Sequence, residues 1–337
     1  MLTEVLSPAL DTEPGASLAR AASVLRAGGL VAFPTETVYG LGAVATDRAA
    51  VARIFAAKGR AATNPVIVHV ADIASARTLV RAWPLQAQRL AEQFWPGPLT
   101  LVLPKTDLVP EIVTAGGPTV GLRVPAHPLA LALVRATGRP IAAPSANRSQ
   151  CISPTTAAHV LKQLSGRIDL VIDGGAAPGG LESTVLDLSG NKPRLLRPGL
   201  VTLGELEAAI GEPVLCGPGE AETGDIARSP GLEARHYAPR VPLELIAEQC
   251  TQVVQRHCQA HRLIGWLPLG SDRGLKSSNL RTLVMPDDPR DYGARLYAAL
   301  HELEDAGVER IVVEAPPDLP VWQAVRDRLR RGSAAEG

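Results

Sequence analysis

The sequence predicts a two-domain α/β protein whose first domain is built on a mixed sheet. Apolar runs typical of strands alternate with stretches of helical periodicity along most of the chain. Several strands follow one another with no helix between them, which favours a mixed sheet over a purely parallel one. A chain of 337 residues also exceeds what one hydrophobic core usually supports, so we expect two domains.

The first domain is expected to span residues 15–212. Its first helix, 16–27, carries small and branched apolar side chains on one face and stops at Gly28-Gly29. Ser153 is expected to cap a later helix, with Pro154 at the first helical position. Further helices are expected at 47–57, 73–94 with a break near Trp83-Pro84, 128–137, 155–164 and 202–210. Strands are expected at 30–33, 66–70, 99–103, 119–124 and 141–144, and in the strings IDLVID, STVLDL and PRLLR.

Residues 213–240 are expected to form a linker. From Cys216 to Arg240 the chain has no periodicity and many glycines and prolines, and connections of about 25 residues are usually functional or disordered. The string RHYAP within it is too specific for a passive tether. Beyond it, residues 241–332 predict a small three-layer α/β domain. Its strands are expected in VPLELIA, RLIGWLP, RTLVMP and ERIVVEAP, and its helices at 251–261, 290–306 and from Val321.

Charge and cysteine content limit the classes of partner and the cellular compartment that we expect. Lys plus Arg equals Asp plus Glu at 34 each, so the whole molecule has no field that would hold nucleic acid, and any phosphate site must be local. Cys151, Cys216, Cys250 and Cys258 show neither metal-ligand spacing nor a disulfide framework, which favours buried thiols in a reducing compartment. The start of the chain does not resemble a secretory signal, and no apolar run reaches the length of a membrane helix. We therefore expect a soluble, cytoplasmic protein with no membrane partner.

The stretch from Leu30 to Val70 gathers the densest set of candidate residues. Thr35–Thr37 follow a strand, Lys58 and Arg60 end a helix, Asn64 lies in the next loop, and His69 interrupts an apolar strand. Two cations, hydroxyls, an amide and an imidazole suit a polyanion beside a small polar molecule. The alternatives are ordinary: the cations could be solvated charges at a helix end, and a lone histidine in a strand is often a satisfied core residue.

Later strand ends carry similar side chains. Arg123 lies within an apolar strand, where an unpaired guanidinium would be costly, so it should face a carboxylate or phosphate, and the partner could be an internal acid. Ser145-Ala146-Asn147 follows another strand, at a position where ligands bind in open α/β sheets, although Ser145 alone could be a turn former. Ser183 and Arg197 are open to a surface interpretation. The glycines at 174–180 lack the Lys-Ser/Thr of a Walker site and more simply permit tight turns.

Eight strings then carry a resemblance. They are PTETVYGLG, KGRAATNP, WPGPLTLVL, TVGLRVP, APSAN followed by SPT, ESTVLDL, LLRPG and SPGLEARHYAP. In this order over residues 30–239 they resemble the YrdC-type family, specifically its long, two-domain threonylcarbamoyl-adenylate synthases. The chain departs from the pattern at Ala61, where proline is expected, and at Gln150, where glycine is common. The resemblance implies a YrdC-like twisted mixed sheet with flanking helices and a small C-terminal Rossmann-like domain.

The resemblance also implies a reaction. The family joins L-threonine, bicarbonate or CO2, and ATP into threonylcarbamoyl-AMP and pyrophosphate, the first step of threonylcarbamoyladenosine formation in tRNAs that read codons beginning with A. The threonine amine captures CO2 as a carbamate, whose oxygen attacks the α-phosphorus. Since that nucleophile is already anionic, the site needs positioning and charge neutralisation rather than a Ser-His-Asp relay, and the sequence offers no such relay.

By the same resemblance, Lys58 and Arg60 are the catalytic residues. The nucleotide would be bound by Lys58, Arg60, Asn64, Thr119, Ser145, Asn147, Ser153, Arg197 and Tyr237. Threonine would be bound by Thr35, His69, Arg123 and Ser183, with Arg123 on its carboxylate. Tyr237 would close over the nucleotide as a lid and exclude water.

Mg²⁺ is expected to be coordinated by the ATP phosphates, with no ligand from a protein side chain. The expected partners are the small substrates and the downstream tRNA threonylcarbamoyl transferase machinery, with a weak tRNA contact left open. Two other functions compete with this one. A carbamoyl-AMP-forming maturation enzyme would carry paired-cysteine zinc modules that this chain lacks, and an RNA-binding module is disfavoured by zero net charge and 3% aromatic residues.

Overall fold

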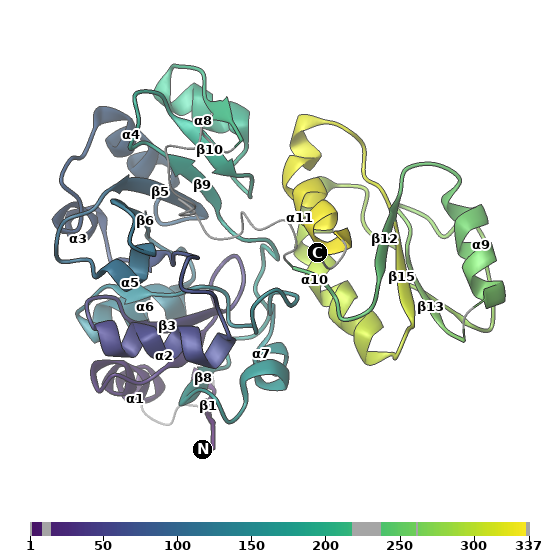
Figure 1. The fold of residues 1–337 in the computed structure, drawn as a ribbon, viewed down its shortest axis with the longest axis horizontal. Helices are drawn as coiled ribbons and strands as arrows, with labels where there is room; N and C mark the ends of the chain where they lie inside the picture. The colour runs from purple at the N-terminus through teal and green to yellow at the C-terminus, as the bar shows by residue number, and fades with distance from the viewer. Residues whose placement is uncertain (1, 9–14, 218–236, 261, 335–337) are drawn as a thin grey trace. The chain divides into compact units, whose positions relative to one another are not determined.

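A computed structural model describes residues 2–8, 15–217, 237–260 and 262–334 (Figure 1). The described residues form two compact units. The first contains residues up to 149, then 154–178 and 182–217. The second contains the C-terminal part from 237 together with two short segments, 150–153 and 179–181, from earlier in the chain. Most of the expected linker, 218–236, lies outside the described residues.

The first unit is built on a mixed sheet of 11 strands in the order β1-β8-β2-β3-β7-β4-β6-β5-β9-β10-β11. β2 runs parallel to β8 but antiparallel to β3, and β4 runs parallel to β6 but antiparallel to β7. The predicted mixed sheet is therefore confirmed. The strands are β1 (Glu4–Leu6), β2 (Val31–Phe33), β3 (Gly40–Val44), β4 (Val68–His69), β5 (Leu99–Pro104), β6 (Thr119–Arg123), β7 (Ile141–Ala142), β8 (Leu170–Ile172), β9 (Thr184–Asp187), β10 (Arg194–Arg197) and β11 (Leu215–Cys216).

Helices cover both faces of this sheet. Alternate residues of β2 enter separate cores: Ala32 packs into the larger one, while Val31 and Phe33 pack into the other. Burial on both faces explains why β2 reads as a continuous apolar run rather than an alternating one. The helices are α1 (Ala16–Arg26), α2 (Arg48–Lys58), α3 (Ile73–Thr78), α4 (Leu85–Phe94), α5 (Glu111–Thr114), α6 (Pro128–Thr137), α7 (Ala157–Leu164) and α8 (Leu203–Ile210).

Helix α2 shows how the sequence places two of the candidate cations. The Asp47 carboxylate accepts hydrogen bonds from the backbone N–H groups of Ala49 and Ala50, which satisfies donors that the first turn leaves unpaired. The helix ends at Lys58, and Gly59 adopts φ 63°, a left-handed conformation that glycine takes without strain. The chain turns there, and Lys58 and Arg60 contact different loops.

Strand β3 was not predicted. The string YGLGAV contains two glycines, which weaken strand propensity, so its first half predicts a loop. Gly42 is required by packing, because a Cβ atom there would lie 2.8 Å from side-chain atoms of both Ile141 and Phe33. The short elements β1, α5 and β11 were also not predicted.

Two local predictions are wrong. Thr156, not Ser153, caps α7: its side chain accepts from the backbone N–H of His159, and the helix begins at Ala157. The cysteines are not all buried thiols, because Cys216 is exposed on the edge strand β11 and Cys151 and Cys258 are partly exposed. None of the four cysteines, all of which are described, forms a disulfide.

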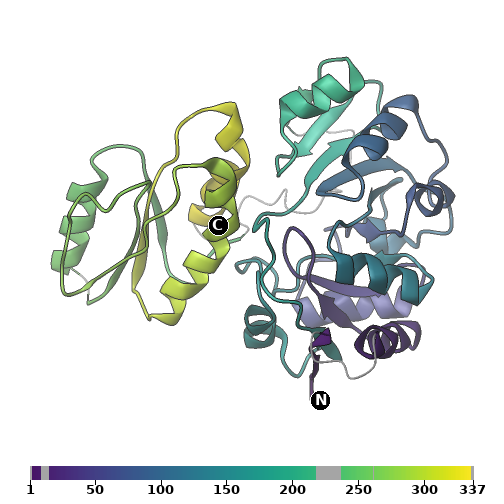
Figure 2. The same ribbon diagram turned by 180° about the vertical axis from the view of Figure 1, so that it is seen from behind.

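The second unit is a three-layer α/β domain, as predicted. Its parallel sheet has the order β12-β15-β13-β14. Helix α9 lies on one face, and α10 and α11 lie on the other, in both views (Figures 1 and 2). The strands are β12 (Leu243–Ile246), β13 (Ile264–Leu267), β14 (Leu280–Thr282) and β15 (Arg310–Glu314), and the helices are α9 (Cys250–Ala260), α10 (Pro289–Asp305), a 3₁₀ turn (Pro320–Trp322) and α11 (Gln323–Ser333).

Candidate active site

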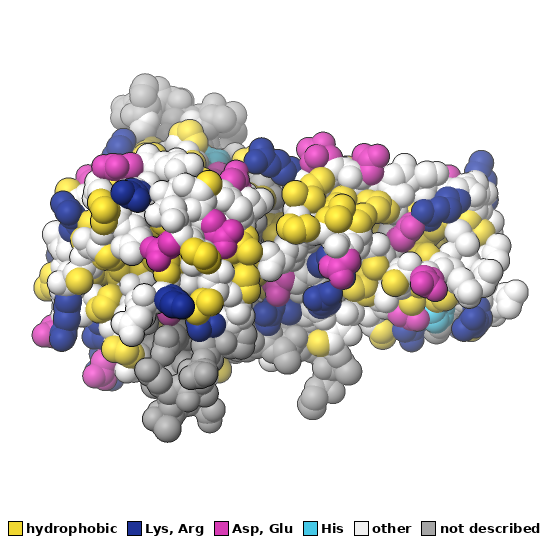
Figure 3. Space-filling view, turned by 90° about the horizontal axis from the view of Figure 1, so that it is seen from above, with side chains coloured by type: hydrophobic (Ala, Val, Ile, Leu, Met, Phe, Trp, Pro, Cys, Tyr) yellow, Lys and Arg dark blue, Asp and Glu magenta, His cyan; other side chains and the backbone are white. Residues whose placement is uncertain are grey.

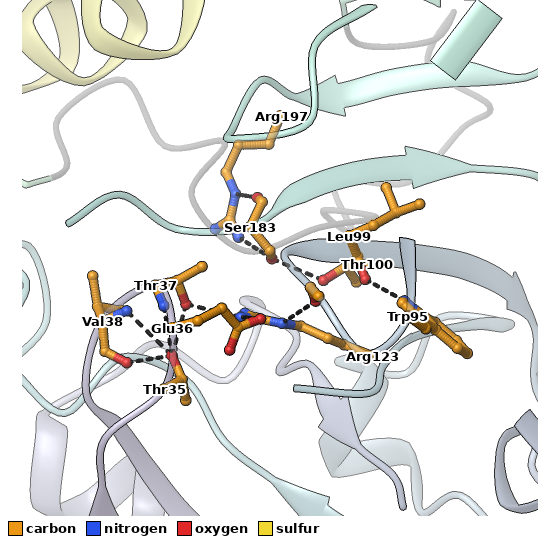
Figure 4. Close-up of polar contacts among 11 residues, drawn as sticks. Thr35, Glu36, Thr37, Val38, Trp95, Leu99, Thr100, Arg123, Ser183 and Arg197 are labelled. Carbon is orange, nitrogen blue, oxygen red and sulfur yellow. Dashed lines mark hydrogen bonds and ion pairs between the residues drawn. The ribbon is translucent and has the colours of Figure 1, made fainter. Parts of the chain in front are cut away.

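The turn after β2 is held rigid by its own hydroxyl groups. Thr35 Oγ1 donates to the carbonyl oxygen of Val38 at 2.6 Å and lies 2.8 Å from Thr37 Oγ1. The same oxygen accepts from the backbone N–H groups of Thr37 and Val38. Both threonines are buried. The turn therefore fixes the direction in which the intervening residue, Glu36, leaves the backbone (Figure 4).

Arg123, the last residue of β6, reaches this turn. Its Nη2 donates to Thr37 Oγ1 at 3.0 Å, and its Nε donates to the carbonyl oxygen of Gly97 at 3.1 Å. Strands β2 and β6 are four positions apart in the sheet, about 19 Å at the usual strand spacing, which is more than an arginine side chain spans. The 35–38 turn must therefore reach across the intervening strands toward β6.

Glu36 supplies the partner that Arg123 requires. One oxygen of its carboxylate lies 2.6 Å from Arg123 Nη2, and the side chains are only 14% and 4% exposed. Burial by itself raises the pKa of the Glu36 carboxyl, but the charge and donors of Arg123 with nearby backbone N–H groups outweigh it, so the pKa lies below its ordinary value. The internal acid that the sequence left open as a partner for Arg123 is thus Glu36.

His69 lies beside this ion pair. It ends β4 and is paired in register with Arg123 on the neighbouring strand. Burial and the charge of Arg123 lower the pKa of His69 to about 3, so the imidazole is neutral at physiological pH. Its ring packs edge-on against Phe33, with centroids 6.1 Å apart, and among the described residues its Nδ1 has no hydrogen-bond partner. A buried nitrogen in this condition suits a ligand group better than a satisfied core histidine.

Ser183 and Arg197 meet just before β9 and at the end of β10. Arg197 Nε donates to the Ser183 carbonyl oxygen at 3.1 Å, and Nη2 donates to Ser183 Oγ at 3.2 Å. Ser183 Oγ also lies 2.8 Å from Thr100 Oγ1 on β5 (Figure 4). All three side chains are buried. Arg197, which is expected to bind the nucleotide, therefore contacts Ser183, which is expected to bind threonine.

The 95–98 turn joins these two clusters. Gly97 offers its carbonyl oxygen to Arg123, and Pro98 offers its own to the backbone N–H of Thr184, the residue after Ser183. The structure therefore brings Thr35, His69, Arg123 and Ser183, the four residues expected to bind threonine, into one connected network.

The Lys58 ammonium organises the loop after β7. Its Nζ donates to the Ser145 carbonyl oxygen at 2.6 Å and also contacts the carbonyl oxygen and the side-chain oxygen of Asn147. Lys58 is 2% exposed, so it is not a solvated charge at a helix end. The same loop is tied to the residue between the 35–38 turn and β3, because the backbone N–H of Ala146 donates to the Tyr39 carbonyl oxygen.

Arg60 donates hydrogen bonds to the loop that follows it in the chain. Nε donates to the Asn64 carbonyl oxygen at 3.1 Å, and Nη2 contacts Asn64 Oδ1 and the Pro65 carbonyl oxygen. Both side chains are buried. Lys58 thus ends α2, Arg60 and Asn64 lie on the loop that follows this helix, and Ser145 and Asn147 lie on the loop after β7 that Lys58 contacts.

Three expected nucleotide residues lie apart from these contacts. Thr119 begins β6, four residues or about 13 Å along the strand from Arg123. Ser153 belongs to the second unit, where its carbonyl oxygen lies 3.2 Å from His301 Nε2. Tyr237 also belongs to the second unit; its ring is buried against Tyr297, and the Arg328 guanidinium lies 5.1 Å from the ring centroid. The expected lid residues before Tyr237 lie outside the described residues.

Sequence reasoning missed three contributors. Glu36 and Thr37 were seen only as part of a polar loop, and Thr100 was hidden in the strand string LTLVL. The available signal was a buried arginine that required a carboxylate, together with one hydroxyl residue in an otherwise apolar strand.

Known proteins match both halves of the chain. Residues 23–199 match the family described as "Telomere recombination", and residues 201–334 match "Threonylcarbamoyl-AMP synthase, C-terminal domain". Relatives named threonylcarbamoyl-AMP synthase from Pyrococcus abyssi and Bacillus subtilis are 42% and 43% identical. The alignments cover 93% of this chain and 93% of the first relative, and 94% of this chain and 92% of the second.

A solved structure of P. abyssi Sua5 with L-threonine has a TM-score of 0.89 and 39% identity, and the match covers 99% of this chain and 98% of that one. A doubly substituted form of the same protein gives the same TM-score and identity, with 98% and 96% covered. The eight strings, the two-unit fold and these matches agree. The chain belongs to the two-domain threonylcarbamoyl-AMP synthase family.

Proposed function

We infer that this protein is a threonylcarbamoyl-AMP synthase that uses L-threonine and ATP as substrates. The observation that carries the inference is the match to synthases of this name along more than nine-tenths of the chain, through both units. The site agrees with it, because buried cations and hydroxyls form two neighbouring groups, one suited to a polyphosphate and the other to a small amino acid.

The reaction demands little acid–base chemistry once the carbamate has formed. A carbamate oxygen attacks the α-phosphorus of ATP, and the bond from that phosphorus to the β-phosphate oxygen breaks as pyrophosphate leaves. The protein must hold two anions in contact and neutralise the charge that passes to the leaving group. Buried cations in fixed positions supply both.

We propose that the contact between Arg197 and Ser183 marks the boundary between the two substrates. Thr35, His69, Arg123 and Ser183 would bind threonine, and Lys58, Arg60, Asn64, Thr119, Ser145, Asn147, Ser153, Arg197 and Tyr237 would bind the nucleotide. The reacting carbamate and α-phosphate would then meet beside Arg197, whose guanidinium is already fixed by Ser183. Fixed donors of this kind need no reorganisation as charge develops.

Mg²⁺ would be held by the phosphates and water. Within the described ranges, His, Cys, Asp and Glu side chains form no group of three that could hold a metal ion. Magnesium commonly keeps several waters and binds substrate phosphates, so phosphate oxygens and water would supply its ligands. The ion would neutralise phosphate charge, while Lys58, Arg60 and Arg197 would orient the triphosphate.

The two competing functions are not favoured. On the face shown in Figure 3, basic and acidic side chains are interspersed, as expected for a chain with zero net charge and unlike the basic stripe of a nucleic-acid-binding surface. The match to synthases runs through the C-terminal unit as well, which a carbamoyl-AMP-forming maturation enzyme would not explain.

We further propose that the product passes to a tRNA threonylcarbamoyl transferase in the cytoplasm, where ATP and tRNA are available. Among the described residues, none of the helices has the length and apolarity that crossing a bilayer would need.

Pyrophosphate release from ATP tests the function. Each of the twenty amino acids is supplied in turn, with and without bicarbonate. Turnover that requires both L-threonine and bicarbonate is the expected result, and equal turnover with valine would contradict it, because valine leaves the hydroxyl-binding groups unpaired. Release of AMP without an amino acid would indicate a different reaction.

A further inference from the structure

The ion pair between Glu36 and Arg123 is poorly explained as a stabilising contact. Both carboxylate oxygens of Glu36 are buried, and the nearby backbone N–H groups that lower its pKa form no well-aligned hydrogen bond with either oxygen. Arg123 Nη1 likewise donates no hydrogen bond to a described residue, since the bonds it makes involve Nε and Nη2. A buried ion pair repays its desolvation only when further hydrogen bonds complete both partners. The Glu36 carboxylate can therefore accept further hydrogen bonds, and the Arg123 guanidinium can donate further ones.

The charges around the pair restrict what can complete it. His69 is neutral at physiological pH because its pKa is about 3, so it adds no positive charge. Lys58 donates to the loop after β7, and Arg60 donates to the loop after α2. The charged side chains at this position are therefore one anion, Glu36, and one cation, Arg123. A ligand that brought only a carboxylate would satisfy Arg123 and leave Glu36 without a cation.

A free amino acid brings both charges at a fixed spacing. Its ammonium nitrogen and carboxylate carbon are joined through one Cα and lie about 2.5 Å apart. The acceptor for the ammonium must therefore lie next to the arginine that takes the carboxylate. Glu36 meets that condition, with an oxygen 2.6 Å from Arg123 Nη2, on a turn that Thr35 and Thr37 hold in place.

We propose that Glu36 recognises the ammonium group of the amino acid while Arg123 takes its carboxylate, so that the zwitterion replaces one internal ion pair with two external ones. This inference rests on the proposed function, because it concerns the threonine side of the same site. Glu36 acts as a specificity residue: it favours amino acids over carboxylic acids that lack an amine.

Calorimetric titration of the full chain with two ligands tests the proposal. L-threonine carries both charges, and 3-hydroxybutanoate keeps the carboxylate and the hydroxyl but lacks the amine. Glu36→Gln should weaken threonine binding about 10- to 100-fold, the range expected for a charge-assisted hydrogen bond, and should leave 3-hydroxybutanoate binding unchanged or tighter. Asp187→Asn is the matched control, since Asp187 is a buried carboxylate on β9 that bonds to Ser189 rather than to Arg123.

Two results would overturn the proposal. Equal weakening of both ligands would mean that Glu36 only positions Arg123. Equal tightening of both would mean that Glu36 only competes for Arg123 with the ligand carboxylate. Glu36→Asp keeps the charge and should retain a preference for threonine, so it answers the same question if the glutamine variant does not fold. If the wild-type chain binds no threonine, the proposed function fails; if it binds and the glutamine variant keeps the wild-type preference, only the role of Glu36 fails.

Discussion

Arg197 and Ser183 are joined by two hydrogen bonds, one to the serine carbonyl oxygen at 3.1 Å and one to its Oγ at 3.2 Å. The first residue is expected to face the triphosphate and the second to face threonine. Their contact implies that the two binding sites are not energetically independent, because a change at one alters a hydrogen-bond donor of the other.

Arg197→Ala should therefore weaken threonine binding even when ATP is absent. Loss of one donor to Ser183 Oγ costs about 0.5–1.5 kcal/mol, which corresponds to a dissociation constant about 2- to 10-fold higher. Calorimetry with threonine alone measures this. Arg194→Ala is the control, because Arg194 begins the same strand and, within the described residues, its side chain donates a hydrogen bond to the Gly217 carbonyl oxygen at 3.5 Å and none to Ser183. An unchanged threonine affinity would separate the two sites.

Arg60→Ala should reduce threonine- and bicarbonate-dependent pyrophosphate release at least about 100-fold, the usual cost of removing a fixed donor from a developing charge. Arg60→Lys keeps the charge but loses the fork that holds Asn64 and Pro65, so it should recover part of the rate. Arg48→Ala, on the exposed start of α2, should behave as wild type. Near-normal turnover in Arg60→Ala would remove Arg60 from the mechanism.

The long elements of the fold could be predicted because each carries its own signal. The apolar run before Pro34 and the helix that Asp47 caps are local patterns, and the structure places both where the sequence indicates. β3 could not be predicted in the same way. Gly42 is required by contacts with Phe33 and Ile141, and such contacts exist only after the chain has folded.

The candidate site likewise has a part that the sequence predicts and a part that depends on the fold. Arg123 was identifiable because a guanidinium in an apolar strand must have an acid or phosphate partner. Which acid it meets depends on the 35–38 turn reaching across three intervening strands, and no spacing along the chain encodes that. The same holds for Thr100, whose role depends on Ser183 approaching from 83 positions away.

His69 should make stability depend on pH between pH 7 and pH 5. Its folded pKa of about 3 lies far below its ordinary value, so in this window only the unfolded chain takes up the proton, and stability falls as the pH drops. The linkage amounts to about 2 kcal/mol between pH 7 and pH 5. Urea unfolding should show that His69→Asn loses about that much less than wild type. Parallel pH profiles would mean that His69 is protonated in the folded chain. The lowered pKa of Glu36 has the same sign but acts below pH 4.5.

Tyr237 has a packing role that must be separated from any role at the nucleotide. Its side chain is 1% exposed, and its ring centroid lies 5.9 Å from that of Tyr297. Tyr237→Ala should lower the free energy of unfolding by about 3–5 kcal/mol, as for other large aromatic truncations. Tyr237→Phe keeps the ring, so a loss of pyrophosphate release without a loss of thermal stability would support a contact between the hydroxyl and the nucleotide. Full activity in the phenylalanine variant would leave only the packing role.

Gln150 offers a stabilising substitution. It adopts φ 66°, a left-handed conformation that costs a residue with a Cβ about 1–2 kcal/mol, and its side chain is exposed. Its carbonyl oxygen accepts from the backbone N–H of Ala238 at 3.0 Å, which holds this conformation in place. The glycine that the resemblance leads us to expect here would adopt this backbone conformation without strain. Gln150→Gly removes the strain, while the greater freedom of glycine in the unfolded chain offsets about 0.5–1 kcal/mol of the gain. We expect the free energy of unfolding to rise by about 0.5–1 kcal/mol in urea titrations. Gln150→Ala removes the same side-chain atoms but keeps the Cβ, so it should give no gain; equal stability of the two variants would show that φ at this position carries no strain.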